Sequence, residues 1–140
     1  MAAIEQDRQQ IAAVLEQYRF GFAVLNVEQL KAIWDQDYEN ILYIAQEAAL
    51  PMRGWAKVSQ YYESVAESLK QVKTMTISDL SIDVFEDVAY AFCTFHFEGE
   101  VEGNSLRIAD GRNTFVLHRK DEMWKVIHYH ESAPGSVQIA

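Results

Sequence analysis

The stretch Gly111–Ser132, GRNTFVLHRKDEMWKVIHYHES, decides the fold of this chain. It contains two runs of alternating residues, Arg112–Arg119 and Met123–Glu131, on either side of the polar break Lys120–Glu122. Alternation over this length, in residues rich in Thr, Val, Ile and aromatics, indicates a β-hairpin. Because both faces of the hairpin carry large apolar side chains, we expect helices to cover one face and a further layer to cover the other.

The second strand of this hairpin presents two faces, because successive side chains on a strand point to opposite sides of the sheet. We predict that the face with Trp124 lines the hollow side of the sheet. The polar break lacks the Gly or Asn that a two-residue turn prefers, so a longer loop is expected. One predicted face holds Trp124, Val126, His128 and His130, and the other holds Met123, Lys125, Ile127, Tyr129 and Glu131.

Composition narrows the class of protein. The 140 residues, 49% of them hydrophobic, suffice for one domain with a sizeable core. The net charge of −9 disfavours binding to nucleic acid or to anionic membranes, because both require basic surface. The single Cys93 lies in an apolar run and is expected to be a buried, inert thiol. The polar N-terminus and the absence of a ~20-residue apolar run predict a soluble cytoplasmic protein.

The N-terminal half is predicted to be mainly helical. Apolar residues at spacings of three, four and seven give an amphipathic helix over residues 4–25. Asn26 with Gln29 is a variant of the capping box and opens a short helix that runs to about Trp34. A short β-run over residues 40–45 follows, and a third helix covers residues 55–70. Asp35 and Asp37 are interpreted as the solvated end of the second helix.

The remainder of the chain is predicted to be strand. The apolar residues stand mainly at odd positions up to Ile77 and mainly at even positions from Leu80 onward. Such a shift of one residue is typical of a β-bulge that bends a sheet. Residues 88–101 form a nearly continuous apolar strand. The next strand begins at Leu106 and is interrupted at Gly111. The expected fold is therefore α+β, with three N-terminal helices on the concave face of a strongly curved mixed or antiparallel sheet, in the order ααβ(β)αββββ.

Three helices can cover only one face of such a sheet. The opposite face carries too much apolar area to stay in contact with water in a monomer. We therefore expect a homodimer formed by two-fold pairing of sheets. From the alternation of side chains along the strands, the expected interface consists of Tyr90, Phe92, Val116, Ile127 and Tyr129.

The order of elements, with GRNTFVLHR at residues 111–119 and WKVIHYHESAP at residues 124–134, resembles the SnoaL-like, nuclear-transport-factor-2-like superfamily. The C-terminal run is also similar to the association domain of calcium/calmodulin-dependent protein kinase II. The resemblance implies a cone-shaped α+β barrel, a cavity between sheet and helices, and a dimer on the other sheet face. Family members include isomerases, dehydratases, cyclases and non-catalytic binding or assembly domains, so the fold leaves function open.

Two departures from these relatives limit the functions that carry over. The position of the general base in isomerases of the superfamily falls within residues 42–44, which lack a carboxylate. Where the kinase association domain places two pocket arginines, this chain has Phe95 and Phe115. Phenyl rings would favour an apolar cavity, whereas arginines would bind a carboxylate ligand.

His128 and His130 are the predicted polar groups of the cavity. Histidine titrates near neutral pH and can act as an acid or base, although a structural role hydrogen-bonded to neighbouring groups is the alternative. No metal or cofactor is predicted, because His-x-His has no further ligands at a diagnostic spacing. Seven aromatic residues are candidates to line a pocket for a flat or hydrophobic molecule, although core packing alone could explain them. They are Phe22, Trp34, Tyr43, Tyr62, Phe95, Phe115 and Trp124.

The leading hypothesis is a domain that binds a small hydrophobic or aromatic molecule in a mostly apolar cavity. The first alternative is an enzyme of the cyclase, dehydratase or isomerase type. Its acid/base group would be His130 or His128, with Tyr18 or Asp37 assisting. The second alternative is an association module that builds an oligomer larger than a dimer.

Overall fold

The protein is described by a computed structural model, which covers residues 2–103 and 105–139. Its element order confirms the predicted one and includes a second short strand before the third helix. Within these residues, no helix has the length and apolar character needed to cross a membrane. The elements are α1 (Ala2–Ala23), α2 (Val27–Ala32), β1 (Leu42–Ile44), β2 (Met52–Arg53), α3 (Trp55–Ser68), β3 (Gln71–Phe85), β4 (Val88–Val101), β5 (Ser105–Lys120) and β6 (Met123–Ser132).

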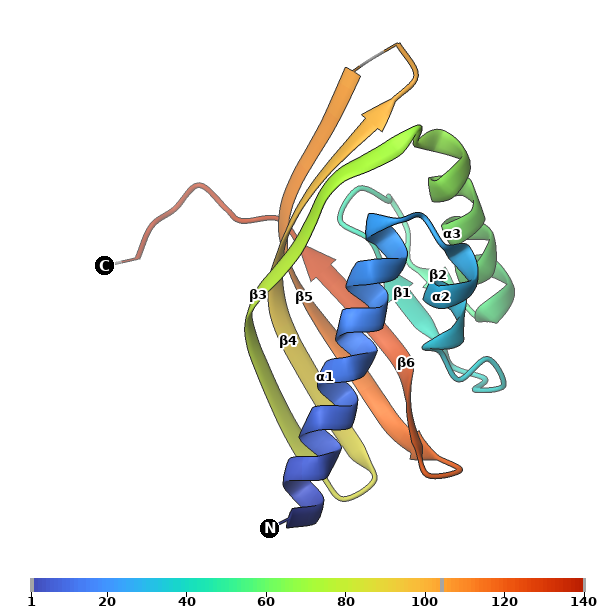
Figure 1. Ribbon diagram of the computed structural model, residues 1–140, viewed down its shortest axis with the longest axis vertical. Helices are drawn as coiled ribbons and strands as arrows, with labels where there is room; N and C mark the ends of the chain where they lie inside the picture. Colours follow the sequence, from blue (N-terminus) through green and yellow to red (C-terminus); the bar gives the residue numbers. More distant parts are fainter. Residues whose placement is uncertain (1, 104, 140) are drawn as a thin grey trace.

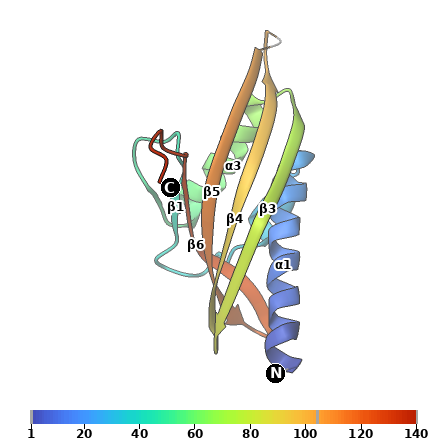
Figure 2. The same ribbon diagram turned by 90° about the vertical axis from the view of Figure 1, so that its left-hand side faces the viewer.

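The six strands form one mixed sheet in the order β2-β1-β6-β5-β4-β3. β1 pairs with β6 in parallel, and all other neighbours are antiparallel. The three helices lie on one face of the sheet, and the C-terminal tail leaves from the other side (Figure 1). β3, β4 and β5 run side by side as long strands (Figure 2). The predicted α+β class is confirmed, but the sheet is open, with β2 and β3 at its edges, instead of a barrel.

β3 contains the predicted bulge. Its register against β4 shifts between Ser78 and Ser81, and Asp79 there adopts a φ of 55°. β5 differs from the prediction, because it continues through Gly111 without interruption. Gly111 pairs with Phe95 and gives the ring of Phe95 room to lie across the strand. The absence of a side chain at Gly111 therefore lets the Phe95 ring pack against a continuous strand.

The β5–β6 hairpin has a two-residue turn, contrary to the predicted longer loop. Lys120 pairs with Met123, and Asp121 and Glu122 between them have φ values of 51° and 65°. Positive φ at both central residues is the geometry of a type I′ turn, which suits the twist of the flanking strands. The twist of the hairpin therefore outweighs the poor preference of Glu122 for the left-handed region, which Asp121 tolerates better.

β6 also contains a bulge, at Ile127. Val116 pairs with His128, whereas Leu117 pairs with Val126, so Ile127 is an extra residue on its strand. The predicted common face of Trp124, Val126, His128 and His130 is therefore wrong. The side chains after Ile127 face the opposite side from the one predicted, because one added residue turns all later side chains of the strand to the other face.

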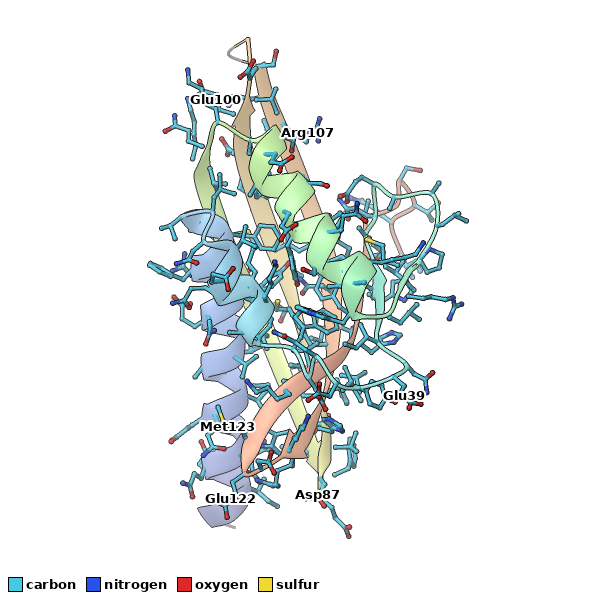
Figure 3. The ribbon with its side chains drawn as sticks, turned by 90° about the vertical axis from the view of Figure 1, so that its right-hand side faces the viewer. Glu39, Asp87, Glu100, Arg107, Glu122 and Met123 are labelled. Carbon is cyan, nitrogen blue, oxygen red and sulfur yellow. The ribbon has the colours of Figure 1, made fainter. Side chains whose placement is uncertain are left out.

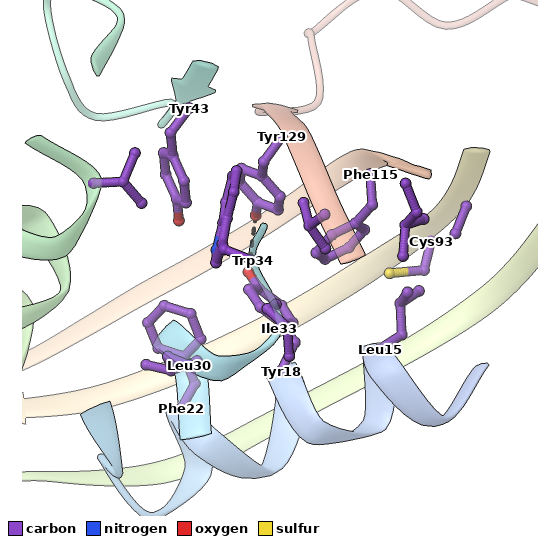
Figure 4. Close-up of a cluster of buried hydrophobic side chains, with 14 of the residues drawn as sticks. Leu15, Tyr18, Phe22, Leu30, Ile33, Trp34, Tyr43, Cys93, Phe115 and Tyr129 are labelled. Carbon is purple, nitrogen blue, oxygen red and sulfur yellow. Dashed lines mark hydrogen bonds between the residues drawn. The ribbon is translucent and has the colours of Figure 1, made fainter. Parts of the chain in front are cut away.

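The core fills the space between α1, α3 and the helix-facing side of the sheet. One stripe of α1, consisting of Ile11, Leu15, Tyr18 and Phe22, is buried there, as its spacing predicts. Figure 4 shows Tyr18 and Phe22 reaching toward the aromatic side chains of the opposite layer. Tyr43 and Tyr129 stack at 4.4 Å between ring centroids in that layer.

Polar contacts anchor the N-terminal segments to the hairpin. Arg119 makes a two-pronged ion pair with Asp7 of α1, at 3.0 Å for both contacts, and lies over the ring of Trp124. The predicted cap of α2 is confirmed, since the Asn26 side chain accepts a hydrogen bond from the backbone NH of Gln29.

The segment after α2 corrects one interpretation. Asp37 is solvated, as expected, but Asp35 is buried. The Asp35 carboxylate accepts hydrogen bonds from His118 Nε2 at 2.7 Å and Lys120 Nζ at 2.8 Å. The backbone NH of Asp35 also donates a hydrogen bond to the carbonyl oxygen of Val126. Both the side chain and the backbone of Asp35 therefore bind this segment to the hairpin.

Candidate functional site

A cavity of about 300 Å³ lies between the helices and the inner face of the sheet. α1 and α3 form one wall, and strands β3, β4 and β5 form the other. The segment after β1 and the end of β6 close one side. The lining residues are Tyr18, Phe22, Tyr43, Gln46, Glu47, Tyr61, Val65, Ser68, Leu69, Met75, Phe95, Phe97, Arg107, Ile108, Ala109 and Glu131.

Most of this lining is apolar. Phe95 and Phe97 come from alternate positions of β4, so both rings project toward the helices. Phe22 of α1 packs edge-to-face against Phe97, with ring centroids 6.5 Å apart. The size and the apolar walls match those of pockets for small organic molecules.

Glu131 supplies a buried carboxylate at one side of the cavity. Its residue is only 9% exposed. The side chain accepts a hydrogen bond from the Tyr129 hydroxyl at 2.7 Å and another from the backbone NH of Gln46 at 3.1 Å. Burial is the main cause that raises the pKa of Glu131 above its usual value, and the bond from Tyr129 offsets part of that effect. A carboxyl group of this kind can exchange a proton nearer neutral pH than a solvated one.

A chain of hydrogen bonds leads from α1 to this carboxylate. The Tyr129 hydroxyl donates to Glu131, so it accepts from the Tyr18 hydroxyl at 2.8 Å and from Asn113 Nδ2 at 3.0 Å. The bond between the two tyrosines is drawn in Figure 4. Cys93 Sγ donates to Asn113 Oδ1, which fixes the orientation of the Asn113 amide. Each group of this hydrogen-bond chain has a partner, and the chain holds Glu131 in one position.

Three neighbouring side chains complete the polar side of the cavity. The Tyr61 hydroxyl of α3 donates to the Glu47 carboxylate. Burial raises the pKa of Tyr61, so its hydroxyl stays protonated. Gln46 Oε1 is buried and accepts no hydrogen bond from any residue that the structure describes. The acceptors of this side that line the cavity are therefore the carboxylates of Glu47 and Glu131.

The structure divides the predicted site residues into four groups, of which the two histidines form the last. Tyr18, Phe22, Tyr43 and Phe95 line the cavity. Four others are buried in the adjacent core without lining it, and Trp34 among them donates from Nε1 to the Tyr62 hydroxyl at 2.9 Å. Asp37 is exposed beside Lys120, away from the cavity. The four core residues are Trp34, Tyr62, Phe115 and Trp124.

His128 and His130 lie outside the cavity, contrary to the prediction. They line a groove of about 480 Å³ on the outer face of the sheet, together with Phe92, Arg112 and Val116. Burial, and then the nearby His130, lower the pKa of His128, which favours its neutral form. The bulge at Ile127 is the physical reason for this placement.

The same bulge places Glu131 in the cavity, where sequence reasoning had assigned it to the outer face. It also removes Tyr129 from the predicted dimer surface, because that side chain is fully buried in the core. Gln46 and Glu47 were missed because they follow a three-residue strand without any periodic pattern. An unpaired Ile in a strand gives no compositional signal, so no feature of the sequence marks the change of face.

Within residues 2–103 and 105–139, no group of three or more His, Cys, Asp or Glu side chains is placed to hold a metal ion. Cys93 is buried as expected, and burial raises the pKa of its thiol to about 12. The polar side chains that line the cavity are those of Glu131, the tyrosines, Gln46 and Glu47, together with Ser68 and Arg107.

Comparisons with known proteins agree with this architecture. A sequence profile described as the SnoaL-like domain matches residues 11–136. A nuclear-transport-factor-2-like superfamily protein from Salmonella enterica superposes with a TM-score of 0.83 at 18% identity, covering 96% of both chains. A protein from Streptomyces avermitilis, provisionally assigned as a dehydratase of the NTF2-like family, reaches 0.83 at 16% identity, covering 94% of this chain and 99% of its own.

The predicted likeness to a kinase association domain is also found at the level of fold. A Xanthomonas campestris protein, provisionally assigned as a calcium/calmodulin-dependent protein kinase II association domain, gives a TM-score of 0.75 at 16% identity. The match covers 91% of this chain and 87% of that one. A search by sequence among proteins of curated function found no match.

Proposed function

This chain belongs to the SnoaL-like domain family, and from that premise we propose that its cavity binds a small, largely apolar molecule. The observation that carries the proposal is an apolar cavity of about 300 Å³ with a buried carboxylate, Glu131, at one side. Pockets of this kind derive affinity from their apolar walls and orientation from a few polar groups.

Native mass spectrometry of the purified protein tests this proposal directly. We expect an adduct of a small organic molecule that dissociates on collisional activation. Ala109→Trp places a large ring in the cavity and should abolish the adduct. Ala49→Trp, on an exposed loop, is the matched control and should retain it. A wild-type protein that neither carries an adduct nor binds flat apolar probes contradicts the proposal.

A second candidate function is acid/base catalysis on such a molecule. The observation that favours it is the raised pKa of Glu131 together with its fixed position at the end of the Tyr18–Tyr129 chain. Groups with shifted pKa values in a cavity are typical of acids and bases in enzymes. The provisional assignment of the Streptomyces avermitilis protein as a dehydratase is in line with this candidate. Glu131 takes the role that sequence reasoning had given to His128 or His130.

Proton exchange at an acidic C–H group tests this candidate without knowledge of the substrate. The probe is 2-tetralone in D₂O, followed by NMR. We expect the protein to accelerate exchange and Glu131→Gln to lower the rate by at least about 100-fold. His130→Ala, on the outer face, should leave the rate unchanged. Exchange no faster than in buffer counts against this candidate.

We also propose that a second copy of the chain covers the outer face of the sheet. Phe92, Val116 and Ile127 are half-buried there, and Tyr90 lies on the same side of β4. Two-fold pairing of such faces is the simplest way to remove this apolar area from water. An assembly larger than a dimer would instead favour the association module as the function.

A further inference from the structure

We propose that the cavity selects ligands that carry a cationic amine on an apolar skeleton, with the amine bound beside Glu131. This inference rests on the proposed binding function and names the chemical class of its ligand. It follows from which polar atoms face the cavity and where they lie.

The polar side of the cavity offers acceptors. A carboxylate has room for about four hydrogen bonds, and that of Glu131 receives one from Tyr129 and one from the backbone of Gln46. The neighbouring Glu47 carboxylate receives one bond from Tyr61. A ligand group that reaches this side therefore meets unused acceptor capacity on two carboxylates.

Gln46 adds no acceptor to this side. Its Oε1 atom is enclosed by protein atoms, without a hydrogen-bond partner among the described residues, and is not open to a ligand.

Two tyrosine donors near this side are already engaged. The Tyr61 hydroxyl donates to Glu47, and the Tyr18 hydroxyl donates to Tyr129. The one cationic side chain of the lining is Arg107, which is exposed near the tip of the β4–β5 hairpin (Figure 3). Glu131 pairs with Asn113 of β5, and Arg107 lies six residues before Asn113 on the same strand. Six residues of a strand span about 20 Å, so the backbone of Arg107 lies that far from the pair.

Electrostatics then favour a cation over a neutral donor. An ammonium group beside Glu131 forms a charge-assisted hydrogen bond in a site of limited water access. A carboxylate ligand would instead be repelled by Glu131 and Glu47 and would find Arg107 far away. The net charge of −9 also attracts cations to the protein as a whole.

Three probes of one skeleton test the inference by titration calorimetry near pH 7.5: 1-naphthylmethylamine, 1-naphthylmethanol and 1-naphthoate. We expect the amine to bind about tenfold more tightly than the alcohol, and the naphthoate to bind weakest. Glu131→Gln should remove the advantage of the amine while the alcohol still binds. Glu122→Gln loses the same charge in the distant β5–β6 turn and should preserve the ranking (Figure 3).

The outcomes distinguish the preference for an amine from the binding function on which it rests. Equal affinities, or a preference for the naphthoate, overturn the inference and leave the binding function standing. Failure of all three probes to bind a folded wild-type protein overturns the binding function and the inference with it. The ranking in the wild-type protein decides the matter even if Glu131→Gln does not fold.

Discussion

At the scale of single residues, Ile127 has the widest consequences in the sheet. As the extra residue of a bulge, it directs Trp124 and Val126 to the core on one side of it and Tyr129 and Glu131 to the core on the other. A regular strand would carry Glu131 to the outer face instead. The buried carboxylate of the cavity therefore exists because the strand contains one additional residue.

The turn at Asp121 and Glu122 gives a prediction about stability. Both residues hold a left-handed backbone, which costs roughly 1–2 kcal/mol at Glu122 and less at Asp121, because Asp tolerates this region as Asn does. The double substitution Asp121→Asn and Glu122→Gly should raise the free energy of unfolding by about 1 kcal/mol, measured by urea denaturation. Glu122→Ala is the control and should give no gain, because alanine is equally strained there. No gain in the double variant would show that this strain is not relieved by the substitution.

His96 gives a prediction about pH. Its ring bonds Glu98 at 2.6 Å and Asp110 at 2.7 Å, and these bonds raise the pKa of His96 in the folded state. The unfolded value is about 6.5, so this stabilisation is complete below about pH 6.5 and is lost as pH rises through the higher folded pKa. In urea denaturation, the wild type should exceed His96→Gln in stability near pH 5.5, and the difference should shrink by about pH 8.5. A difference that is equal at both pH values contradicts this account.

At the scale of elements, β5 shows how packing can override a local breaker. Gly111 suggested an interruption, because glycine weakens strands. In the structure the ring of Phe95 occupies the space that a side chain at residue 111 would need. The strand remains continuous because burial of that ring against the glycine outweighs the loss of intrinsic strand preference.

Gly111→Ala tests this explanation. The added Cβ would lie 2.3 Å from Cζ of Phe95, so the ring must move within a packed region. We expect a loss of roughly 1–3 kcal/mol in unfolding free energy, together with weaker binding of apolar probes, because Phe95 lines the cavity. Gly135→Ala has no atom within 4 Å of the new Cβ and should change neither quantity. A neutral Gly111→Ala would show that the ring relocates freely.

The elements themselves could be predicted because their signals are local. The spacing along α1, the cap at Asn26 and the parity change near Asp79 each involve residues close in sequence, and the structure confirms all three. The composition of the site could not be predicted in the same way. Its polar side combines the end of β6 with the segment after β1, and their meeting depends on the parallel β1–β6 pairing and on the bulge at Ile127.

At the scale of the whole molecule, the two faces of the sheet differ in chemistry. The inner face carries the aromatic core and the cavity with Glu131. The outer face mixes Phe92 and Val116 with Arg112, His128 and His130 around a shallow groove. Moving the histidines to this second face separates them from any chemistry in the cavity, so their expected contribution is to contacts between copies of the chain.

Light scattering coupled to size-exclusion chromatography tests the proposed dimer. We expect a wild-type dimer at micromolar concentration and a folded monomer for Phe92→Glu. By two-fold symmetry the substitution places two unpaired carboxylates in the interface, and each buried charge costs several kcal/mol. Leu50→Glu, at a loop position that is 76% exposed, adds the same charge and should remain dimeric. A monomeric wild type contradicts the pairing, whereas a larger wild-type assembly that Phe92→Glu dissolves points to an association module built on this face.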